Sequence, residues 1–168
     1  MDCDGAPDGA ELEVSILDGA GETVWTGRPG RAAVPDARPW DTENPTLYRC
    51  AVRLLAPGGT ELDRQETAFG FRTIEFKADG FYLNGRKTFL RGLNRHQSYP
   101  YVGYAAPEAL QREDARILKE ELSCTAVRTS HYPQSRHFID ECDRLGLLVF
   151  TEIPGWQHIG DMAWKNQA

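Results

Sequence analysis

Three short clusters in the second half of the chain carry the side chains that could do chemistry. They are residues 94–97 (NRHQ), residues 128–132 (RTSHY), and the pair at residues 151–152 (TE), which is followed by Trp156 and His158. Imidazole, guanidinium and amide groups donate hydrogen bonds to hydroxyl groups, and tyrosine or tryptophan can pack on the apolar face of a sugar ring. Since no GxGxxG or Walker A sequence is present to hold phosphate, the clusters suit a neutral, hydroxyl-rich ligand.

The flanking patterns predict the elements that position these clusters. Asn84-Gly85 lies between the apolar runs at residues 81–83 and 88–90. This pair indicates a β-hairpin, because a type I′ turn needs positive φ at both central residues, which Asn and Gly tolerate. Short strands are predicted at residues 125–129 and 147–150. Two helices are indicated by apolar stripes, one at Leu110, Ile117, Leu118 and Leu122 after Pro107, the other at Phe138, Ile139, Cys142 and Leu145 between Ser135 as N-cap and Gly146 as stop.

The second half therefore has the order β-α-β-α-β, which is typical of right-handed parallel crossovers. An α/β barrel and a doubly wound sheet both begin in this way. Ligand sites in such folds form beyond the C-terminal ends of the strands. Each of the three clusters follows one predicted strand, so we expect them to lie at one edge of the sheet.

The first half has the alternation of antiparallel strands. Apolar residues recur at every second position over residues 12–16 and 48–54, and the four prolines within residues 28–45 restrict that stretch to loops and short extended pieces. Short strands separated by Gly/Pro turns favour a β-sandwich. About 70 residues are available against the ~100 of a complete immunoglobulin-like sandwich, so we expect it to be cut at its N-terminal side.

Composition excludes several classes of protein. The net charge of -6 argues against nucleic-acid or anionic-membrane partners, which usually require a basic face. No apolar run reaches the roughly 20 residues of a membrane helix, and the N-terminal residues lack the pattern of a signal peptide. The four cysteines form no CxxC pair. Free thiols in a reducing cytoplasm are the expectation.

Several motifs together resemble glycoside hydrolase family 2, which contains β-galactosidases and β-glucuronidases. The run AVRTSHYP at residues 126–133, followed by Phe138-Ile139, Asp143, Gly146 and LLVF at residues 147–150, is similar to the first signature of that family. GLNRH at residues 92–96 resembles its first barrel strand. ENPTLY at residues 43–48 and FGFR at residues 69–72 resemble the end of its immunoglobulin-like domain. The resemblance covers roughly residues 11–165, with one departure at Thr125, where the family commonly has Asn.

The resemblance implies a fold and a reaction. The fold would be the C-terminal part of an immunoglobulin-like β-sandwich (residues 1–74), followed by the first three βα units of a truncated (β/α)8 TIM barrel (residues 75–168). The parent would be a retaining β-glycosidase that hydrolyses terminal β-linked sugars, with β-galactosides ahead of β-glucuronides and β-mannosides. A retaining mechanism uses two carboxyl groups about 5 Å apart. No Asn-Glu pair follows Glu152, so both catalytic glutamates are expected beyond Ala168, and the chain alone is expected to be inactive.

The residues expected to bind the substrate divide into two groups. By resemblance, His96, Arg128 and His131 match positions that line the sugar subsite of the family. Arg128 could also orient a later carboxylate or form a structural ion pair. The remaining expected substrate contacts are Asn94, Glu152, as a sugar contact or a support for other groups, and Trp156, which could stack on a sugar or cap the barrel.

A metal site is the alternative for the same histidines and Glu152, together with His158, but no close His-x-His or HExxH spacing supports it. Some family members use a metal near the third strand end, and their ligand pattern is not recognisable after Glu152. We therefore expect no metal and no cofactor. The expected partners are a β-glycoside and the remainder of the parent polypeptide, with a homo-oligomeric parent left open. The rival hypothesis is a non-catalytic carbohydrate-binding or scaffold chain.

Overall fold

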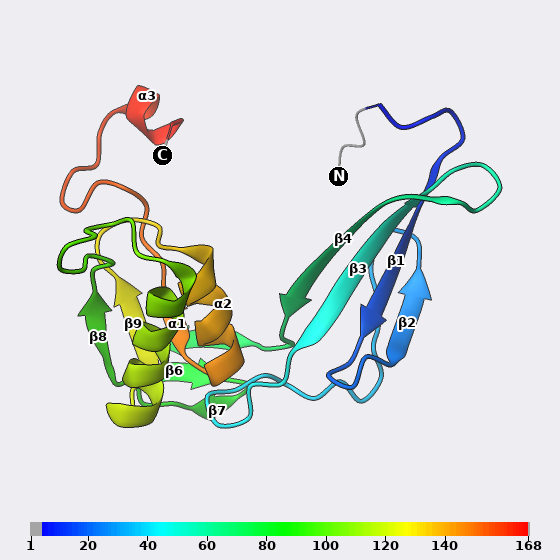
Figure 1. The fold of residues 1–168 in the computed structure, drawn as a ribbon. Coiled ribbons are helices and arrows are strands. Elements are labelled where there is room, and N and C mark those ends of the chain that lie inside the picture. Colours follow the sequence, from blue (N-terminus) through cyan, green and yellow to red (C-terminus); the bar gives the residue numbers. More distant parts are fainter. Residues whose placement is uncertain (1–4, 168) are drawn as a thin grey trace. The chain divides into compact units, whose positions relative to one another are not determined.

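The computed structural model describes residues 5–167, which divide into two compact units (Figure 1). The first unit runs up to Pro39 and resumes over Thr46–Phe71. The second comprises Trp40–Pro45 and the chain from Arg72 onward. The predicted domain boundary between residues 74 and 75 stays a prediction, and each unit is described by itself below.

The first unit contains one four-stranded antiparallel sheet. Its strands are β1 (Glu11–Leu17), β2 (Thr23–Gly27), β3 (Tyr48–Leu55) and β4 (Glu61–Phe69), in the order β2-β1-β3-β4. The alternating residues of β1 and β3 face each other in register, as in the pairs Val14↔Val52 and Ile16↔Cys50. The predicted antiparallel strands are therefore confirmed. A second, opposing sheet is not found among the described residues of this unit, so the sandwich stays a prediction.

Aromatic side chains form the packing of this unit near the end of β4. The rings of Tyr48, Phe69 and Phe71 contact one another at centroid distances of 5.0–6.1 Å, and two of the three contacts are edge-to-face. The buried Tyr48 hydroxyl also accepts a hydrogen bond of 2.9 Å from the backbone N–H of Arg38. A buried tyrosine hydroxyl needs a hydrogen-bond partner, and here the backbone of Arg38 is that partner. The bond therefore joins the proline-rich segment before β3 to the sheet.

A small antiparallel sheet begins the second unit. It consists of β5 (Ile74–Lys77), β6 (Gly80–Leu83) and β7 (Arg86–Lys87), in that order. Asn84 and Gly85 connect β6 to β7 with φ values of 51° and 75°. Both central residues thus have the positive φ of a type I′ turn, and the predicted hairpin is confirmed.

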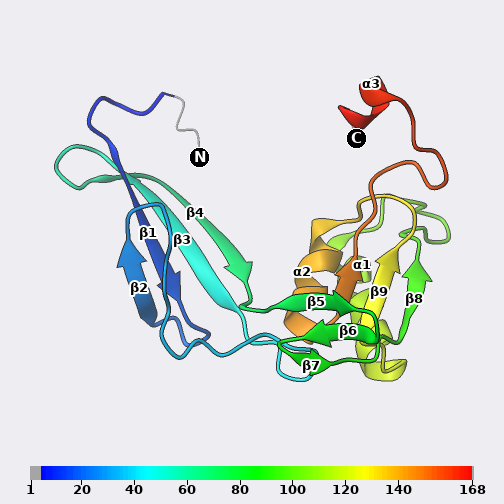
Figure 2. The ribbon, with the colours of Figure 1, turned by 180° about the vertical axis from the view of Figure 1, so that it is seen from behind.

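The α/β part of the second unit follows the predicted order. Strands β8 (Gly92–Arg95), β9 (Ala126–Thr129) and β10 (Leu148–Phe150) form a parallel sheet in the order β10-β9-β8. The connections are α1 (Glu108–Arg116) with a π-helical extension η1 (Ile117–Glu121), and α2 (Arg136–Leu145), which ends at Gly146 in the left-handed region. Figures 1 and 2 show both helices on the same face of the sheet, as two crossovers of one hand require. A short helix, α3 (Met162–Lys165), lies near the end of the chain.

The core of this unit lies between the parallel sheet and the two helices. Val127 of β9 and Phe138 of α2 are almost completely buried there. Cys142 is buried as well, and its burial raises the pKa of its thiol, so the thiol is an unreactive packing group. The core cluster consists of Ala115, Leu118, Cys124, Val127, Phe138, Cys142 and Leu147.

The buried face of α1 differs from the predicted stripe. Of the predicted stripe, Leu118 is buried as expected, but Leu110 and Leu122 are 37% and 53% exposed, and Gln111 and Ala115 are buried in addition. Gln111 is buried because its side chain accepts a hydrogen bond from Arg95 inside the unit, and the spacing of apolar residues cannot reveal such a bond. The wider π-helical turn from Ile117 then changes the angular position of the residues that follow it.

A segment from the first half of the sequence belongs to the second unit. Trp40 is 1% exposed, and its indole N–H donates to the backbone oxygen of Asp143 at 2.7 Å. The guanidinium of Arg72 lies 4.8 Å from the centroid of the Trp40 ring, and the Asn84 side chain donates to the backbone carbonyl oxygen of Trp40 at 3.0 Å. The ammonium of Lys119 donates to the backbone oxygens of Thr42 and Gly146, and burial lowers its pKa. The segment is therefore an integral part of the second unit.

Two further expectations concern thiols and membranes. Cys50, Cys124 and Cys142 are free, as predicted, whereas Cys3 lies outside the described residues. Within residues 5–167 no helix is long and apolar enough to cross a membrane.

Removing the indole of Trp40 should destabilise the second unit. We expect Trp40→Ala to lower its free energy of unfolding by about 3–5 kcal/mol, because a buried aromatic side chain and its cavity are involved, and Trp40→Phe to lose about 1 kcal/mol with the single hydrogen bond. Urea denaturation followed by circular dichroism measures both changes. Trp156→Ala, at a tryptophan that is 68% exposed, is the control. Equal shifts for Trp40→Ala and Trp156→Ala would contradict the packing described.

Candidate functional site

The ends of the three parallel strands bring the predicted site residues to one region of the second unit. In the register of the sheet, Arg128 lies between Asn94 on β8 and Phe150 on β10. The side chains of Asn94 and Arg128 are exposed, and both residues line a shallow hollow of about 220 Å³ on the sheet. His96 and His131 follow β8 and β9, and Glu152 follows β10. The predicted convergence of the three clusters is therefore found in the structure.

Glu152 joins two of these residues through its carboxylate. One oxygen accepts from Nε of Arg128, and the other lies 3.1 Å from Nδ1 of His131. A carboxylate only accepts hydrogen bonds, so Nδ1 of His131 carries the proton in this contact. In the neutral ring, Nε2 is then left as an acceptor, which can bind a hydroxyl group of a ligand.

The two basic partners determine the ionisation of Glu152. Partial burial raises the pKa of this carboxyl, but the hydrogen bonds from Arg128 and His131 and the charge of Arg128 oppose this effect and hold the pKa below its usual range. Glu152 is consequently ionised at neutral pH. It is suited to orienting Arg128 and His131, and it is a poor proton donor in this arrangement.

Backbone and hydroxyl contacts fix the strand ends beneath this cluster. The buried Thr129 hydroxyl donates to the carbonyl of Phe150 and accepts from the backbone N–H of Glu152, both at 3.2 Å. These bonds tie β9 to the residues after β10. Ser130 is also completely buried, and the peptide bond between Ser130 and His131 is cis.

Aromatic rings surround His131. The ring of His96 lies edge-on at a centroid distance of 5.3 Å, and the ring of Trp156 lies at 5.2 Å with an interplanar angle of 31°. Trp156 remains 68% exposed, so most of its surface is open to a ligand. Its contact with His131 brings the tryptophan into the cluster, whereas His158 packs against Trp164 at 5.7 Å. In the described part of the chain, no three His, Cys, Asp or Glu side chains come together as a metal site.

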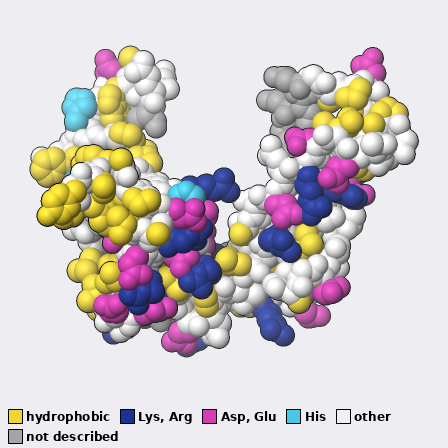
Figure 3. Space-filling model, in the orientation of Figure 1, with side chains coloured by type: hydrophobic (Ala, Val, Ile, Leu, Met, Phe, Trp, Pro, Cys, Tyr) yellow, Lys and Arg dark blue, Asp and Glu magenta, His cyan; other side chains and the backbone are white. Residues whose placement is uncertain are grey.

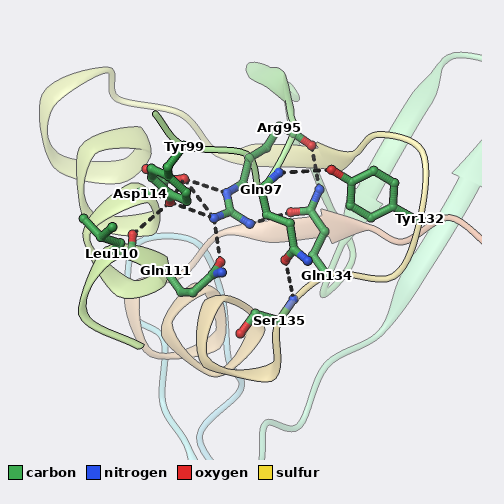
Figure 4. A network of polar contacts seen from close by, with 9 residues as sticks. All are labelled: Arg95, Gln97, Tyr99, Leu110, Gln111, Asp114, Tyr132, Gln134 and Ser135. Atoms are coloured by element: carbon green, nitrogen blue, oxygen red, sulfur yellow. Dashed lines mark hydrogen bonds and ion pairs between the residues drawn. The ribbon is translucent and has the colours of Figure 1, made fainter. Parts of the chain in front are cut away.

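Sequence reasoning missed the most highly connected residue of the region. The side chain of Arg95 is 5% exposed and lies between β8 and the helices (Figure 4). Its Nε donates to Asp114 at 2.8 Å, and its guanidinium carbon lies 3.9 Å from the centroid of Phe138. Its remaining hydrogen bonds go to Gln134 (2.6 Å), Gln111 (2.7 Å) and the Tyr99 hydroxyl (3.1 Å).

Arg95 also belongs to a set of bonds that join the loops after β8 and β9. The Gln134 side chain donates to the backbone oxygen of Arg95 at 2.6 Å. The side chain of Gln97 accepts from the backbone N–H of Ser135 at 2.8 Å, and the backbone N–H of Gln97 donates to the Tyr132 hydroxyl at 3.2 Å. His96 lies between two residues, Arg95 and Gln97, that are both bonded to the next loop. These bonds therefore fix His96 relative to the loop that carries His131.

The alternation of β8 is the signal that could have revealed Arg95. Asn94 and His96 are exposed and point toward the site, so the residue between them points to the opposite face, where the helices pack. An arginine at such a position requires buried acceptors. In the structure, Asp114 and Gln111, which lie three positions apart on α1, supply two of these acceptors.

Comparison with family models covers nearly the whole chain. Residues 4–72 match the model described as glycosyl hydrolases family 2, and residues 74–166 match the model described as glycosyl hydrolases family 2, TIM barrel domain.

Curated relatives and solved structures are similar over most of this chain. The chain is 59% identical over 133 residues to a β-galactosidase of Thermoanaerobacterium thermosulfurigenes, covering 79% of the chain and 18% of that protein. It is 57% identical over 130 residues to a β-galactosidase of Thermoanaerobacter pseudethanolicus, covering 77% of the chain and 17% of that protein. A solved β-glucuronidase of Bifidobacterium dentium superposes with a TM-score of 0.83 at 30% identity, covering 89% of this chain and 26% of the other. The chain thus spans less than a fifth of the length of the two curated relatives.

The pKa of Glu152 gives a direct test of the cluster. Because the pKa is lowered in the folded state, the pairing contributes stability above the ordinary pKa of glutamate and loses it as the pH falls through the lowered value. We expect Arg128→Met to raise the pKa of Glu152, as measured by NMR titration of its carboxyl carbon. Arg136→Met, at an exposed arginine paired with Asp140, should leave it unchanged. An unaltered Glu152 titration in Arg128→Met would refute the ion pair.

Replacement of Arg95 should destabilise the second unit. Arg95→Met leaves the partners of a buried guanidinium without their donor, for which we expect a loss of about 3–5 kcal/mol in the free energy of unfolding. Arg95→Lys should recover only part of this loss, because an ammonium cannot reproduce the planar fork. Arg116→Met on α1, where the ion pairs are exposed, should cost less than about 1 kcal/mol. Chemical denaturation measures all three, and an Arg95→Met loss no larger than that of Arg116→Met would contradict this account.

Proposed function

Because the chain belongs to glycoside hydrolase family 2, we propose that its second unit forms one side of the sugar-binding site of a retaining β-glycosidase. In this proposal β8, β9 and β10 with their helices are the first three βα units of a (β/α)8 barrel. The four-stranded sheet of the first unit is part of an immunoglobulin-like β-sandwich. The two family models, which meet between residues 72 and 74, support this division.

We propose terminal β-linked sugars as the substrates, with β-galactosides ahead of β-glucuronides and β-mannosides. The two curated relatives at 59% and 57% identity are β-galactosidases, whereas the similar solved β-glucuronidase is 30% identical. The identity to the galactosidases favours galactose over glucuronate. A cytoplasmic location and the oligomeric state of the parent stay predictions.

The observation that carries the proposal is the cluster of Glu152, Arg128 and His131 at the ends of the parallel strands. With Nδ1 bonded to Glu152, His131 directs Nε2 toward a sugar hydroxyl. His96 offers a second imidazole beside it, and Trp156 offers an exposed ring face. Asn94 and the free guanidinium donors of Arg128 complete a surface that hydrogen-bonds hydroxyls on one side and packs on a sugar ring on the other.

The cluster positions a substrate and does not by itself supply the chemistry. A retaining glycosidase needs one carboxyl group to protonate the leaving oxygen and a second, about 5 Å away, to attack the anomeric carbon. The cluster holds one carboxylate, Glu152, whose oxygens are bonded to Arg128 and His131. We therefore place both catalytic glutamates in parts of the relatives that this chain does not match, and we propose that the chain alone is inactive.

A non-catalytic carbohydrate-binding role is the second candidate. The single carboxylate of the cluster and the open ring of Trp156 favour it, because both serve binding without hydrolysis. In an enzyme and in a binding module alike, His131 would hydrogen-bond a sugar hydroxyl. Only a measurement of turnover therefore distinguishes the two candidates.

Assays of the purified chain test both candidates. We expect no turnover of chromogenic β-galactoside, β-glucuronide or β-mannoside, and weak binding of methyl β-galactoside that His131→Ala reduces about tenfold, the cost of one good hydrogen bond. NMR titration measures the binding. Turnover that Glu152→Gln abolishes would overturn the view that the catalytic pair lies elsewhere. Methyl β-galactoside binding that His131→Ala leaves intact would overturn the proposed site.

A further inference from the structure

The loop after β8 exposes apolar side chains next to the proposed site. Tyr101 is fully exposed, and Tyr104 and Val102 are 64% and 43% exposed. Figure 3 shows apolar side chains gathered over this part of the second unit. Exposed aromatic groups in a concentrated patch usually mark a surface that binds something.

This loop has a defined conformation. Tyr99 and Gly103 exchange two backbone hydrogen bonds of 2.9 and 3.1 Å, and the N–H of Ala105 donates to the carbonyl of Val102 at 3.0 Å. At its base, the Tyr99 hydroxyl contacts Arg95 and donates to the carbonyl of Leu110 at 3.0 Å. The loop is thus fixed to the buried Arg95 before any ligand binds, which lowers the entropic cost of using its side chains for recognition.

The ring of Tyr104 continues a row of aromatic rings that begins in the site. His96 lies 5.3 Å from His131, Tyr132 lies 6.3 Å from His96, and Tyr104 lies 5.8 Å from Tyr132. Each step falls within the ~4.5–7 Å range of interacting rings. Tyr132 is itself held by the N–H of Gln97, so Tyr104 packs on a fixed neighbour. Trp156 contacts His131 as well, at the opposite end of this row of contacts.

We propose that Tyr104, supported by Tyr132, is a platform for a ring in the leaving group of the substrate. This inference rests on the proposed function, since the platform extends from the histidines that would hold the sugar. A sugar bound at His96 and His131 would have Trp156 as one neighbour and Tyr132 as the other, with Tyr104 lying beyond Tyr132. A leaving group that carries a ring, aryl or pyranose, packs its apolar face on Tyr104, whereas a methyl leaving group does not reach it.

The proposal is tested by comparing glycosides that share the sugar and differ in the leaving group. Methyl β-galactoside, phenyl β-galactoside and lactose are titrated into the 168-residue chain, and NMR gives each dissociation constant. We expect at least one of the two ring-bearing ligands to bind about fivefold more tightly than the methyl glycoside, the contribution of one stacked ring. A gain with phenyl alone assigns the platform to aryl groups, and a gain with both assigns it to either kind of ring.

Variants at two tyrosines of the same loop make the test specific. Tyr104→Ala should remove the gain without altering the affinity for methyl β-galactoside, and Tyr104→Phe should keep it, because the ring face remains. Tyr101→Ala removes the same kind of side chain from a position outside the row and should also keep the gain. The platform is refuted by a gain that survives Tyr104→Ala, by equal losses in Tyr101→Ala and Tyr104→Ala, or by the lack of any gain. Failure of methyl β-galactoside itself to bind would instead refute the proposed function, and the platform with it.

Discussion

The buried guanidinium of Arg95 is the interaction on which the functional side of the second unit depends. A charged group removed from water must find a counter-charge and fill its hydrogen-bonding positions, or the fold that buries it is unstable. Asp114 supplies the charge, Gln111, Gln134 and Tyr99 supply the acceptors, and Phe138 supplies an aromatic face. These partners come from α1, α2 and the loops after β8 and β9. The hydrogen bonds that satisfy the buried guanidinium therefore also fix the loops that carry the candidate site.

Much of the fold could be predicted because it follows from local rules. The Asn84-Gly85 turn, the apolar stripe of α2 and its end at Gly146 each depend on a few neighbouring residues, and the structure contains all three. The rules failed where a distant partner decided the outcome. Gln111 is buried because Arg95 bonds to it, and no count of apolar residues along α1 contains that information. Trp40 lies in a proline-rich stretch without periodicity, and its partner Asp143 is distant in the sequence.

The candidate site was predictable in location and only partly in its bonds. Parallel strands end at a common edge, so the order of strands and helices sufficed to bring Asn94, Arg128 and Glu152 together. The pairing of Glu152 with both Arg128 and His131 depends on the register of β9 and β10 and on the path of the chain after them, which the sequence pattern does not specify. Nor could the pattern show that Tyr104 follows the site residues in a row of rings, because that row depends on how the loop after β8 folds.

The Trp40–Pro45 segment has a consequence for the order in which the molecule acquires its structure. It is synthesised before β3 and β4 but packs with α2, and the residues joined by the indole hydrogen bond are 103 positions apart. At a translation rate of about 5–20 residues per second, Trp40 emerges roughly 5–20 seconds before Asp143. The indole spends that interval without its native neighbours, and closing so long a loop is entropically costly. Completion of the second unit must thus wait until α2 has emerged, and until then the nascent chain presents a large apolar side chain that chaperones can bind.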